Sequence, residues 1–240
     1  MSEHLPPARP HLKFTDEGRR MREVLTYSRR GSRFTPRQQE AWDAYAATYV
    51  IADEAVDGPD FNLAGAFEVE RPLIIEIGCG IGEATAALAA ARPDHNVLGL
   101  EVWLPGVADC VSRFGALGLD NVRMCSVDAV WIMEHLVAPG QLAELWTFFP
   151  DPWPKKRHHK RRLVSPSFAA LAASRLRTGG VWRLATDWAE YAEQMREVLD
   201  AEPALDGGAV PRWRDRPVTK FERKGVAADR DIVDLAYTRT

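Results

Sequence analysis

Short apolar segments alternate with helix-like segments from residue 72 onward, and this alternation constrains the fold more than any other feature. The expected strands are the apolar runs at 73–77, 96–102, 122–127, 145–149 and 181–185. The expected helices follow them at 81–92, 105–117, 129–137, 166–177 and from 187. Strands and helices that alternate through short links form mainly parallel sheets with helices on both faces. The sequence therefore predicts an α/β, Rossmann-like, doubly wound fold.

The two ends of the chain differ from this middle part. Residues 1–37 are rich in proline and arginine and lack periodicity, so we expect a basic, mobile N-terminal arm followed by a single domain over 38–240. Thr35 and Pro36 predict the start of a helix over about 36–52. Near the C-terminus, strand-like runs at 218–223 and 232–239 complete an expected seven-stranded sheet with an antiparallel C-terminal hairpin.

The bulk composition excludes several classes of protein. Hydrophobic residues make up 46% and charged residues 27% of the 240-residue chain, as in ordinary soluble domains. No apolar stretch approaches the ~20 residues that span a bilayer, and the first residues lack the apolar core of a signal peptide, so we expect a cytoplasmic protein with no membrane association. The three cysteines form no CxxC pair and the six histidines show no metal-ligand spacing, so we expect free thiols and no metal. Nothing indicates an obligate protein partner, and monomer and homodimer both remain open.

Positive charge is concentrated in two short segments of a chain whose net charge is -3. Residues 155–162, the basic run, contain six lysines and arginines and two histidines. Residues 19–37 contain seven arginines and one glutamate. The rest of the chain must therefore be acidic. Such a protein is expected to bind a polyanion at one face and to repel it elsewhere. The alternative interpretation of the basic run is a solvated charged loop, which the mutual repulsion of six cations disfavours.

A glycine-rich turn follows the first expected strand. Gly78, Gly80 and Gly82 let the backbone turn tightly and approach a ligand closely. Their GxGxG spacing differs from the GxGxxG of dinucleotide sites, and Glu76 stands two residues before them. A pyrophosphate prefers helix-end amides without a carboxylate nearby, which disfavours a nicotinamide cofactor. A carboxylate there suits a cationic ligand such as S-adenosylmethionine, which carries an ammonium and a sulfonium but no phosphate.

Acidic residues also end the next expected strands. Glu101 ends the second strand, where nucleoside-binding sheets take ribose hydroxyls, and Asp128 ends the third, where an acceptor could meet an adenine amino group. Glu101 alone could equally be a solvated strand end, and Asp128 could simply cap the next helix. Asp151 follows the fourth strand, between Pro150 and Pro152 and just before the basic run. A fixed acid beside dense cations suits a site that holds a polyanion and handles one polar part of it.

These residues resemble those of class I S-adenosylmethionine-dependent methyltransferases, and most closely the bacterial tRNA (guanine-N7)-methyltransferase family. The matching motifs are Glu76-Ile-Gly-Cys-Gly-Ile-Gly82, Phe149-Pro-Asp-Pro-Trp-Pro-Lys155 with the basic run, Ala185-Thr-Asp-Trp188 and Arg216-Pro-Val-Thr-Lys-Phe-Glu222. The glycine motif is common among methyltransferases, whereas the second and fourth motifs are far more specific. Together they cover about residues 25–240.

The resemblance implies a tRNA substrate with a guanine at position 46 of the variable loop. It implies that Glu76, Glu101, Asp128 and Asp151 line the cofactor site with the glycines, with Asp151 also at the reaction centre. The implied substrate contacts are Lys155, Asp187, Thr219, Lys220, Phe221 and Glu222. The implied RNA contacts are Lys156, Arg157, His158, His159, Lys160, Arg161 and Arg162, with Arg29, Arg30 and Arg33 of the arm. Asp187 also fits a capping box with Glu190, and Trp153 could stack on the base or close the end of the sheet.

Guanine N7 carries an in-plane lone pair and no proton, so its methylation requires no base. Our hypothesis is an in-line displacement driven by positioning, in which Asp151, Glu222 and Asp187 stabilise the positive charge that develops on guanine and select that base by hydrogen bonds. Thr219 could add a hydroxyl to the same recognition. The alternatives are a methyltransferase of another structured RNA and an RNA-binding protein on an inactive methyltransferase scaffold.

Overall fold

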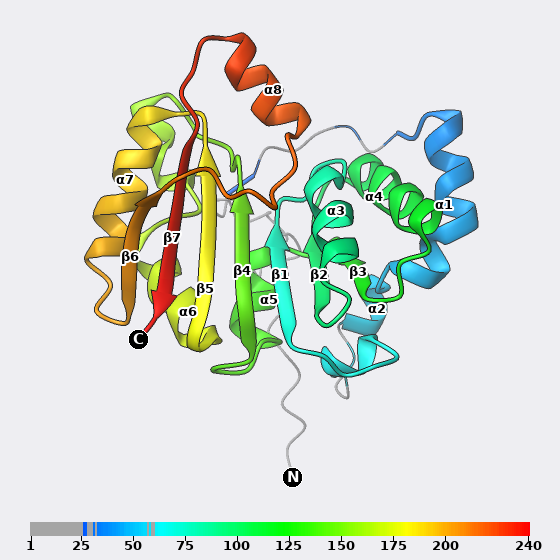
Figure 1. The fold of residues 1–240 in the computed structure, drawn as a ribbon. Coiled ribbons are helices and arrows are strands. Elements are labelled where there is room, and N and C mark those ends of the chain that lie inside the picture. Colours follow the sequence, from blue (N-terminus) through cyan, green and yellow to red (C-terminus); the bar gives the residue numbers. More distant parts are fainter. Residues whose placement is uncertain (1–25, 28–30, 32, 57, 59–60) are drawn as a thin grey trace, which may run out of the picture.

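The computed structural model describes residues 26–27, 31, 33–56, 58 and 61–240 of the chain (Figure 1). Most of the expected N-terminal arm, including Arg29 and Arg30, lies outside the described residues. The first described helix, α1 (Pro36–Tyr49), begins as predicted, because the Thr35 side chain accepts from the Gln38 amide and Gln38 reaches back to Thr35 in a capping box. Helix α6 (Pro166–Arg175) begins in the same way, since Ser165 accepts from the amide of Phe168.

Seven strands form one sheet, as the sequence predicted, and their order is β3-β2-β1-β4-β5-β7-β6. Strands β1 to β5 pair in parallel, and β7 pairs antiparallel with both β5 and β6. The strands span Leu73–Ile77 (β1), Asn96–Leu100 (β2), Val122–Cys125 (β3), Leu142–Phe148 (β4), Leu176–Thr186 (β5), Leu205–Val210 (β6) and Val233–Arg239 (β7). The strand order reverses between β1 and β4, and in open parallel sheets ligands bind at such a reversal, beyond the carboxyl ends of the strands.

Helices cover both faces of this sheet (Figure 1). One face packs against α1, α3 (Glu83–Ala91) and α4 (Leu104–Leu117), and the other against α5 (Ala129–His135), α6 and α7 (Ala189–Asp200). In β1, Ile74 packs in the core on the side of α1, α3 and α4, and Ile75 packs in the core on the side of α5, α6 and α7. Successive side chains of this buried strand therefore point into both cores. Short elements α2 (Asp53–Val56), η2 (Ala64–Ala66) and η3 (Lys156–Arg161) fill the connections.

Two predictions about local structure are wrong. The run at 218–223 is not a strand, because Thr219 caps a helix, α8 (Lys220–Ala227), by accepting from the amide of Glu222 at 3.4 Å. The sixth strand is instead the glycine-containing β6, which pairs with β7 along the edge of the sheet. Asp187 does not form a capping box, since Trp188 is the N-cap of α7 and its side chain accepts no capping hydrogen bond.

The chain between β6 and α8 crosses one face of the sheet and carries α8 to the carboxyl ends of the strands (Figure 1). Trp213 of this segment packs on Trp146 and Phe148 of β4, with ring centroids 5.8 and 6.2 Å away. Helix α8 therefore stands at the same edge of the sheet as the glycine turn, residues 78–82. None of the described helices combines the length and the apolar composition needed to cross a membrane.

Candidate active site

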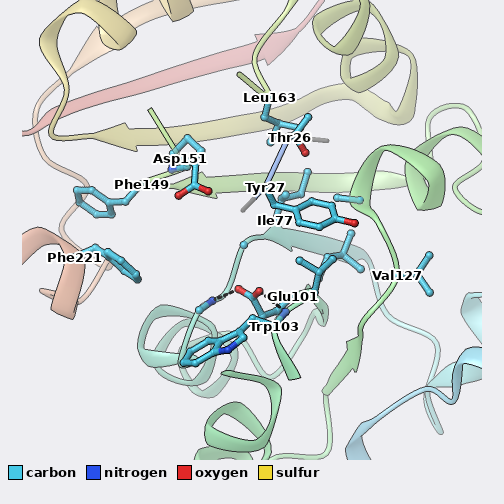
Figure 2. A pocket seen from close by; sticks show the side chains of 16 residues that line it. Thr26, Tyr27, Ile77, Glu101, Trp103, Val127, Phe149, Asp151, Leu163 and Phe221 are labelled. Carbon is cyan, nitrogen blue, oxygen red and sulfur yellow. Dashed lines mark hydrogen bonds between the residues drawn. The ribbon is translucent and has the colours of Figure 1, made fainter. Parts of the chain in front are cut away.

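A cavity opens at the reversal of strand order, beyond the carboxyl ends of β1, β2 and β4 (Figure 2). We call it the edge cavity. Its lining includes Thr26, Tyr27, Ile77, Gly78, Gly80, Glu101, Trp103, Val127, Phe149, Asp151 and Phe221. Figure 2 shows the carboxylates of Asp151 and Glu101 facing this space from opposite sides. The glycine turn and Asp151, which lie about seventy positions apart in the sequence, thus share one cavity.

The glycine turn requires glycine for its backbone and for its close contacts. Gly78, Gly80 and Gly82 all have positive φ angles of 79°, 59° and 76°. A Cβ at Gly82 would also lie 2.8 Å from Cys110 Sγ, which is closer than a side chain allows. The turn is therefore fixed between β1 and the first turn of α3.

Glu101 is held by backbone amides rather than by solvent. Its carboxylate accepts from the N–H of Gly80 and from the N–H of Trp103, both at 2.8 Å. Glu101 therefore ties the end of β2 to the glycine turn, and it lines the edge cavity. Asp128, in contrast, is buried and caps α5 by accepting from the amide of Trp131 at 3.1 Å. The structure thus shows Asp128 as the cap of α5. Its neighbours Val127 and Ala129 line the edge cavity.

Glu76 is the least satisfied acid at this edge. It is 2% exposed, and its Oε2 atom has no hydrogen-bond partner among the described residues. Burial raises its pKa to about 7, the Thr85 side chain opposes this shift, and the nearby charge of Glu101 adds to it. A buried carboxylate oxygen without a donor is costly unless a ligand supplies one. Glu76 borders a smaller cavity that it shares with Phe149, Thr219 and Phe221.

The loop that carries Asp151 is strained and braced. Phe149 and Trp153, on either side of the Pro150–Pro152 sequence, have positive φ angles of 52° and 46°. Non-glycine residues adopt this conformation only where the surroundings impose it, and such residues gather at functional sites. Arg162 donates from Nε to the Pro152 carbonyl at 2.8 Å and so supports the loop from beneath.

The basic run divides into an exposed part and a buried part. Lys155, Lys156, Arg157 and Lys160 are exposed, whereas His158, His159 and Arg161 are half-buried. The side chain of Arg162 is 1% exposed and also donates to Gln194 at 2.5 Å, so in this structure it supports the Asp151 loop and does not reach the surface. Its RNA-binding role remains a prediction without surface support. Arg33 of the arm is exposed.

Trp153 contacts Arg161 and the end of the arm, and whether it stacks on the base stays a prediction. The guanidinium of Arg161 lies over its ring, 3.6 Å from the centroid, and its Nε1 donates to the carbonyl of Thr26 at 3.1 Å. Arg161 Nη2 donates to the carbonyl of Tyr27 at 2.9 Å. These contacts hold the end of the arm against the edge cavity, where Tyr27 lies near Ile77 (Figure 2).

The segment 219–222 contributes one side chain to the edge cavity. Phe221 lines it, Lys220 is exposed, and Thr219 is buried as the cap of α8. Glu222 is 4% exposed, and both its oxygens accept from guanidinium groups: Arg212 at 2.7 Å and Arg216 at 2.6 Å. Burial alone would raise the pKa of Glu222, but the hydrogen bond from Arg212 and the charge of Arg216 lower it overall.

Asp187 is likewise engaged by an arginine. Its Oδ2 atom accepts from Arg230 Nη1 at 2.7 Å, and its side chain is 18% exposed. Gly225 of α8 packs against it so closely that a Cβ there would lie 2.8 Å from the Asp187 Cβ. Glu222 and Asp187 therefore fix the two ends of α8 in this structure, and their predicted contacts with the substrate stay predictions.

Comparison with known proteins places the chain in a family. A family described as "Putative methyltransferase" matches residues 70–235. A tRNA (guanine-N(7)-)-methyltransferase of Nocardioides sp. is 69% identical over all of this chain and 98% of its own length. Enzymes with the same name from Cutibacterium acnes and Pseudomonas aeruginosa are 46% and 43% identical, over 91% and 97% of this chain and 84% and 96% of theirs. The chain belongs to the tRNA (guanine-N(7)-)-methyltransferase family.

Solved structures of more distant methyltransferases share the fold. The aminoglycoside resistance methyltransferase NpmB1 superposes with a TM-score of 0.50 at 16% identity, covering 71% of this chain and 88% of that one. An antibiotic-related methyltransferase superposes with a TM-score of 0.51 at 12% identity, covering 74% and 90%. The expected class I methyltransferase fold is thereby confirmed.

Residues that the sequence did not single out complete the site of this family member. Arg216 is fully buried between Glu222 and Asp234, and its guanidinium lies over the rings of Phe148 and Phe149. Arg216 stands in a recognised motif, so its position was a usable signal. Tyr27 lines the cavity from a segment without any periodic pattern, which gave no signal at all.

Proposed function

We propose that this protein transfers a methyl group from S-adenosylmethionine to N7 of the guanine at position 46 in the variable loop of tRNA. The observation that carries the proposal is the shared cavity of the glycine turn and Asp151, which adjoins the exposed part of the basic run. Membership of a family whose relatives bear this activity in their names supports the same substrate and the same atom.

The residues of the edge fit this methyl donor. S-adenosylmethionine would supply an electrophilic methyl group on a sulfonium, together with an ammonium and a ribose. The unpartnered buried oxygen of Glu76 suits a cationic donor group, which would also favour ionisation of this carboxyl. Glu101, already oriented by two backbone amides, suits hydroxyl donors. The positive φ angles of the glycine turn let its backbone approach the ligand.

Guanine N7, the methyl acceptor, has no proton to lose, so the site must position it and stabilise positive charge rather than supply a base. As the bond from guanine N7 to carbon forms and the carbon–sulfur bond breaks, the bonding electrons stay on sulfur and positive charge passes to the guanine ring. Asp151 faces the cavity and would stabilise this charge where it develops. Its oxygens would also accept from N1–H and the N2 amino group, which adenine does not offer. Because Asp151 lines the edge cavity whereas Glu222 and Asp187 are not in its lining, we assign this role first to Asp151.

The basic surface would hold the RNA around the target base. Lys155, Lys156, Arg157 and Lys160 are exposed beside the Asp151 loop and would contact phosphates, with Arg33 and the exposed Lys220 at the rim. Guanine N7 lies on the major-groove edge, so the base must be loosened from its tertiary contacts to enter the cavity. Extruding a base from its stack costs a few kcal/mol, which the phosphate contacts would offset.

Two tRNA transcripts that differ only at position 46 test the proposal. The protein would be incubated with methyl-labelled S-adenosylmethionine and a transcript bearing G46 or A46, and the methylated site mapped by borohydride and aniline cleavage. The proposal expects label and cleavage at position 46 of the first transcript and neither in the second. Label at another site in both transcripts, or in a different structured RNA alone, would favour the alternative RNA methyltransferase.

A further inference from the structure

Glu83 joins the first turn of α3 to helix α8. It is the first residue of α3, directly after Gly82, and therefore adjoins the glycine turn. Its side chain reaches α8, where Oε1 accepts from Arg223 Nη2 at 2.8 Å and Oε2 accepts from the backbone N–H of Lys220. The side chain is 20% exposed, so this contact lies at the rim of the site rather than in the core.

A second contact joins the same two segments. A Cβ at Gly80 would lie 3.3 Å from Cε2 of Phe221, so the aromatic ring rests directly on the glycine turn. Phe221 is 37% exposed and lines the edge cavity. The segment that carries Phe221 is therefore positioned by the turn on which the methyl donor would lie.

The other attachment of segment 219–222 is to the sheet. Arg216 links Glu222 to Asp234 of β7 through hydrogen bonds of 2.6 and 2.9 Å. Glu83 supplies the opposite attachment, at the N-terminal end of α8, where backbone amides are unsatisfied and a carboxylate is favourable. Without the Glu83 carboxylate, the Lys220 amide loses this acceptor and the Arg223 guanidinium keeps only its hydrogen bond to the Val218 carbonyl. Segment 219–222 is then attached through the sheet and the Phe221 contact.

We propose that Glu83 is a positioning residue for methyl transfer, which holds segment 219–222 over the glycine turn so that Phe221 and the glycine turn stay together in the lining of the edge cavity. The expected effect on methyl transfer rests on the proposed function, whereas the contacts of Glu83 with α8 do not depend on it. Glu83 touches neither reactant in this account and acts through Lys220 and Arg223.

Steady-state kinetics on Glu83→Ala, Glu83→Gln and Arg223→Met test the role in catalysis. Loss of positioning is expected to lower kcat at saturating tRNA and donor by about tenfold in Glu83→Ala, with KM for tRNA changed less than about threefold. Glu83→Gln keeps an acceptor for the Lys220 amide and is expected to retain an intermediate kcat. Adding Arg223→Met to Glu83→Ala should lower kcat little further, because both changes remove the Glu83–Arg223 linkage and the double variant loses in addition only the hydrogen bond from Arg223 to the Val218 carbonyl. Glu197→Ala, on the exposed side of α7, is the matched control and should keep the parent kcat.

Hydrogen exchange and ligand affinity distinguish a positioning role of Glu83 from a purely stabilising role and from a direct ligand contact. Amide hydrogen exchange should be about tenfold faster at Lys220–Arg223 in Glu83→Ala, while the affinity for S-adenosylhomocysteine stays within about twofold. A lowered melting temperature with unchanged kcat and unchanged exchange would overturn the proposal and leave Glu83 a stabilising residue. A large loss of S-adenosylhomocysteine affinity would overturn it in favour of a direct ligand contact. If the parent protein methylates no tRNA while the exchange result holds, the proposed function fails and the linkage between the two segments stands.

Discussion

Replacing Arg216 with methionine should destabilise the folded protein by about 3–5 kcal/mol, the range found when one partner of a buried ion pair is removed. The Arg216 side chain is 0% exposed, and it donates to Glu222 at 2.6 Å and to both oxygens of Asp234 at 3.1 and 2.9 Å. Glu222 would keep Arg212, whereas Asp234 would keep the Trp213 amide at 3.2 Å as its hydrogen-bond donor. The main cost is therefore an uncompensated buried charge on Asp234.

Arg212→Met provides the matched comparison, because Arg212 also pairs with Glu222 but its side chain is 37% exposed. Solvent screening limits that loss to about 1 kcal/mol or less. Urea unfolding followed by tryptophan fluorescence measures both variants. At roughly 2–4 °C per kcal/mol for a chain of this size, Arg216→Met should lower Tm by roughly 6–20 °C. Equal losses in the two variants, or a loss below about 1 kcal/mol in Arg216→Met, would refute the reasoning.

Further predictions concern the chemistry, the buried acid, the glycine turn and the RNA surface. Asp151→Asn should lower kcat roughly 10²-fold at saturating tRNA, and near-normal turnover would contradict the electrostatic role. The raised pKa of Glu76 means that the folded protein holds this proton more tightly than the unfolded chain. The free energy of unfolding should therefore fall as pH rises from about 4.5 to about 7 in the parent protein but not through this group in Glu76→Gln. If urea unfolding gives a difference between the two proteins that does not change over this pH range, the pKa of Glu76 is ordinary. Isothermal titration near pH 7 should also show proton release when S-adenosylhomocysteine binds the parent protein but not Glu76→Gln. Gly82→Ala should reduce the affinity for that ligand, because the new Cβ would clash with Cys110 and strain a φ of 76°; unchanged affinity by titration would show that the turn tolerates a side chain. Replacing both Lys156 and Arg157 with alanine should reduce the slope of log Kd for tRNA against log salt by about 1–2, and an unchanged slope would remove them from the interface.

Apolar runs and helix-capping signals in the sequence predicted most of the central strands and the starts of two helices. The expected strand at 73–77 is β1, and the expected strand at 145–149 overlaps β4, which ends one residue earlier. The proline and serine signals at Pro36 and Ser165 begin helices as expected. The sixth strand escaped prediction because its two glycines have low strand propensity and it is stabilised by pairing with β7. The run at 218–223 misled because β-branched Val218 and Thr219 favour strands, whereas the Thr219 hydroxyl caps a helix there.

In the candidate site, the sequence motifs predicted which residues lie together but not which charged partners they contact. Adjacency of Asp151 to the glycine turn follows from parallel topology and was predictable, since both stand at carboxyl ends of strands on either side of the order reversal. The engagement of Glu222 by Arg216, and of Asp187 by Arg230, depends on partners brought together by the tertiary fold. The motif identified these acids as important but could not reveal which charges they face. Arg162, the last residue of the basic run, is buried for the same reason.

Nucleoside analysis of bulk tRNA tests the central claim most directly. Unmodified tRNA would be incubated with the protein and methyl-labelled S-adenosylmethionine, digested to nucleosides and resolved by mass. We expect the label in 7-methylguanosine, and much less of it with Asp151→Asn. Label confined to any other nucleoside, or no incorporation at all, would contradict the claim.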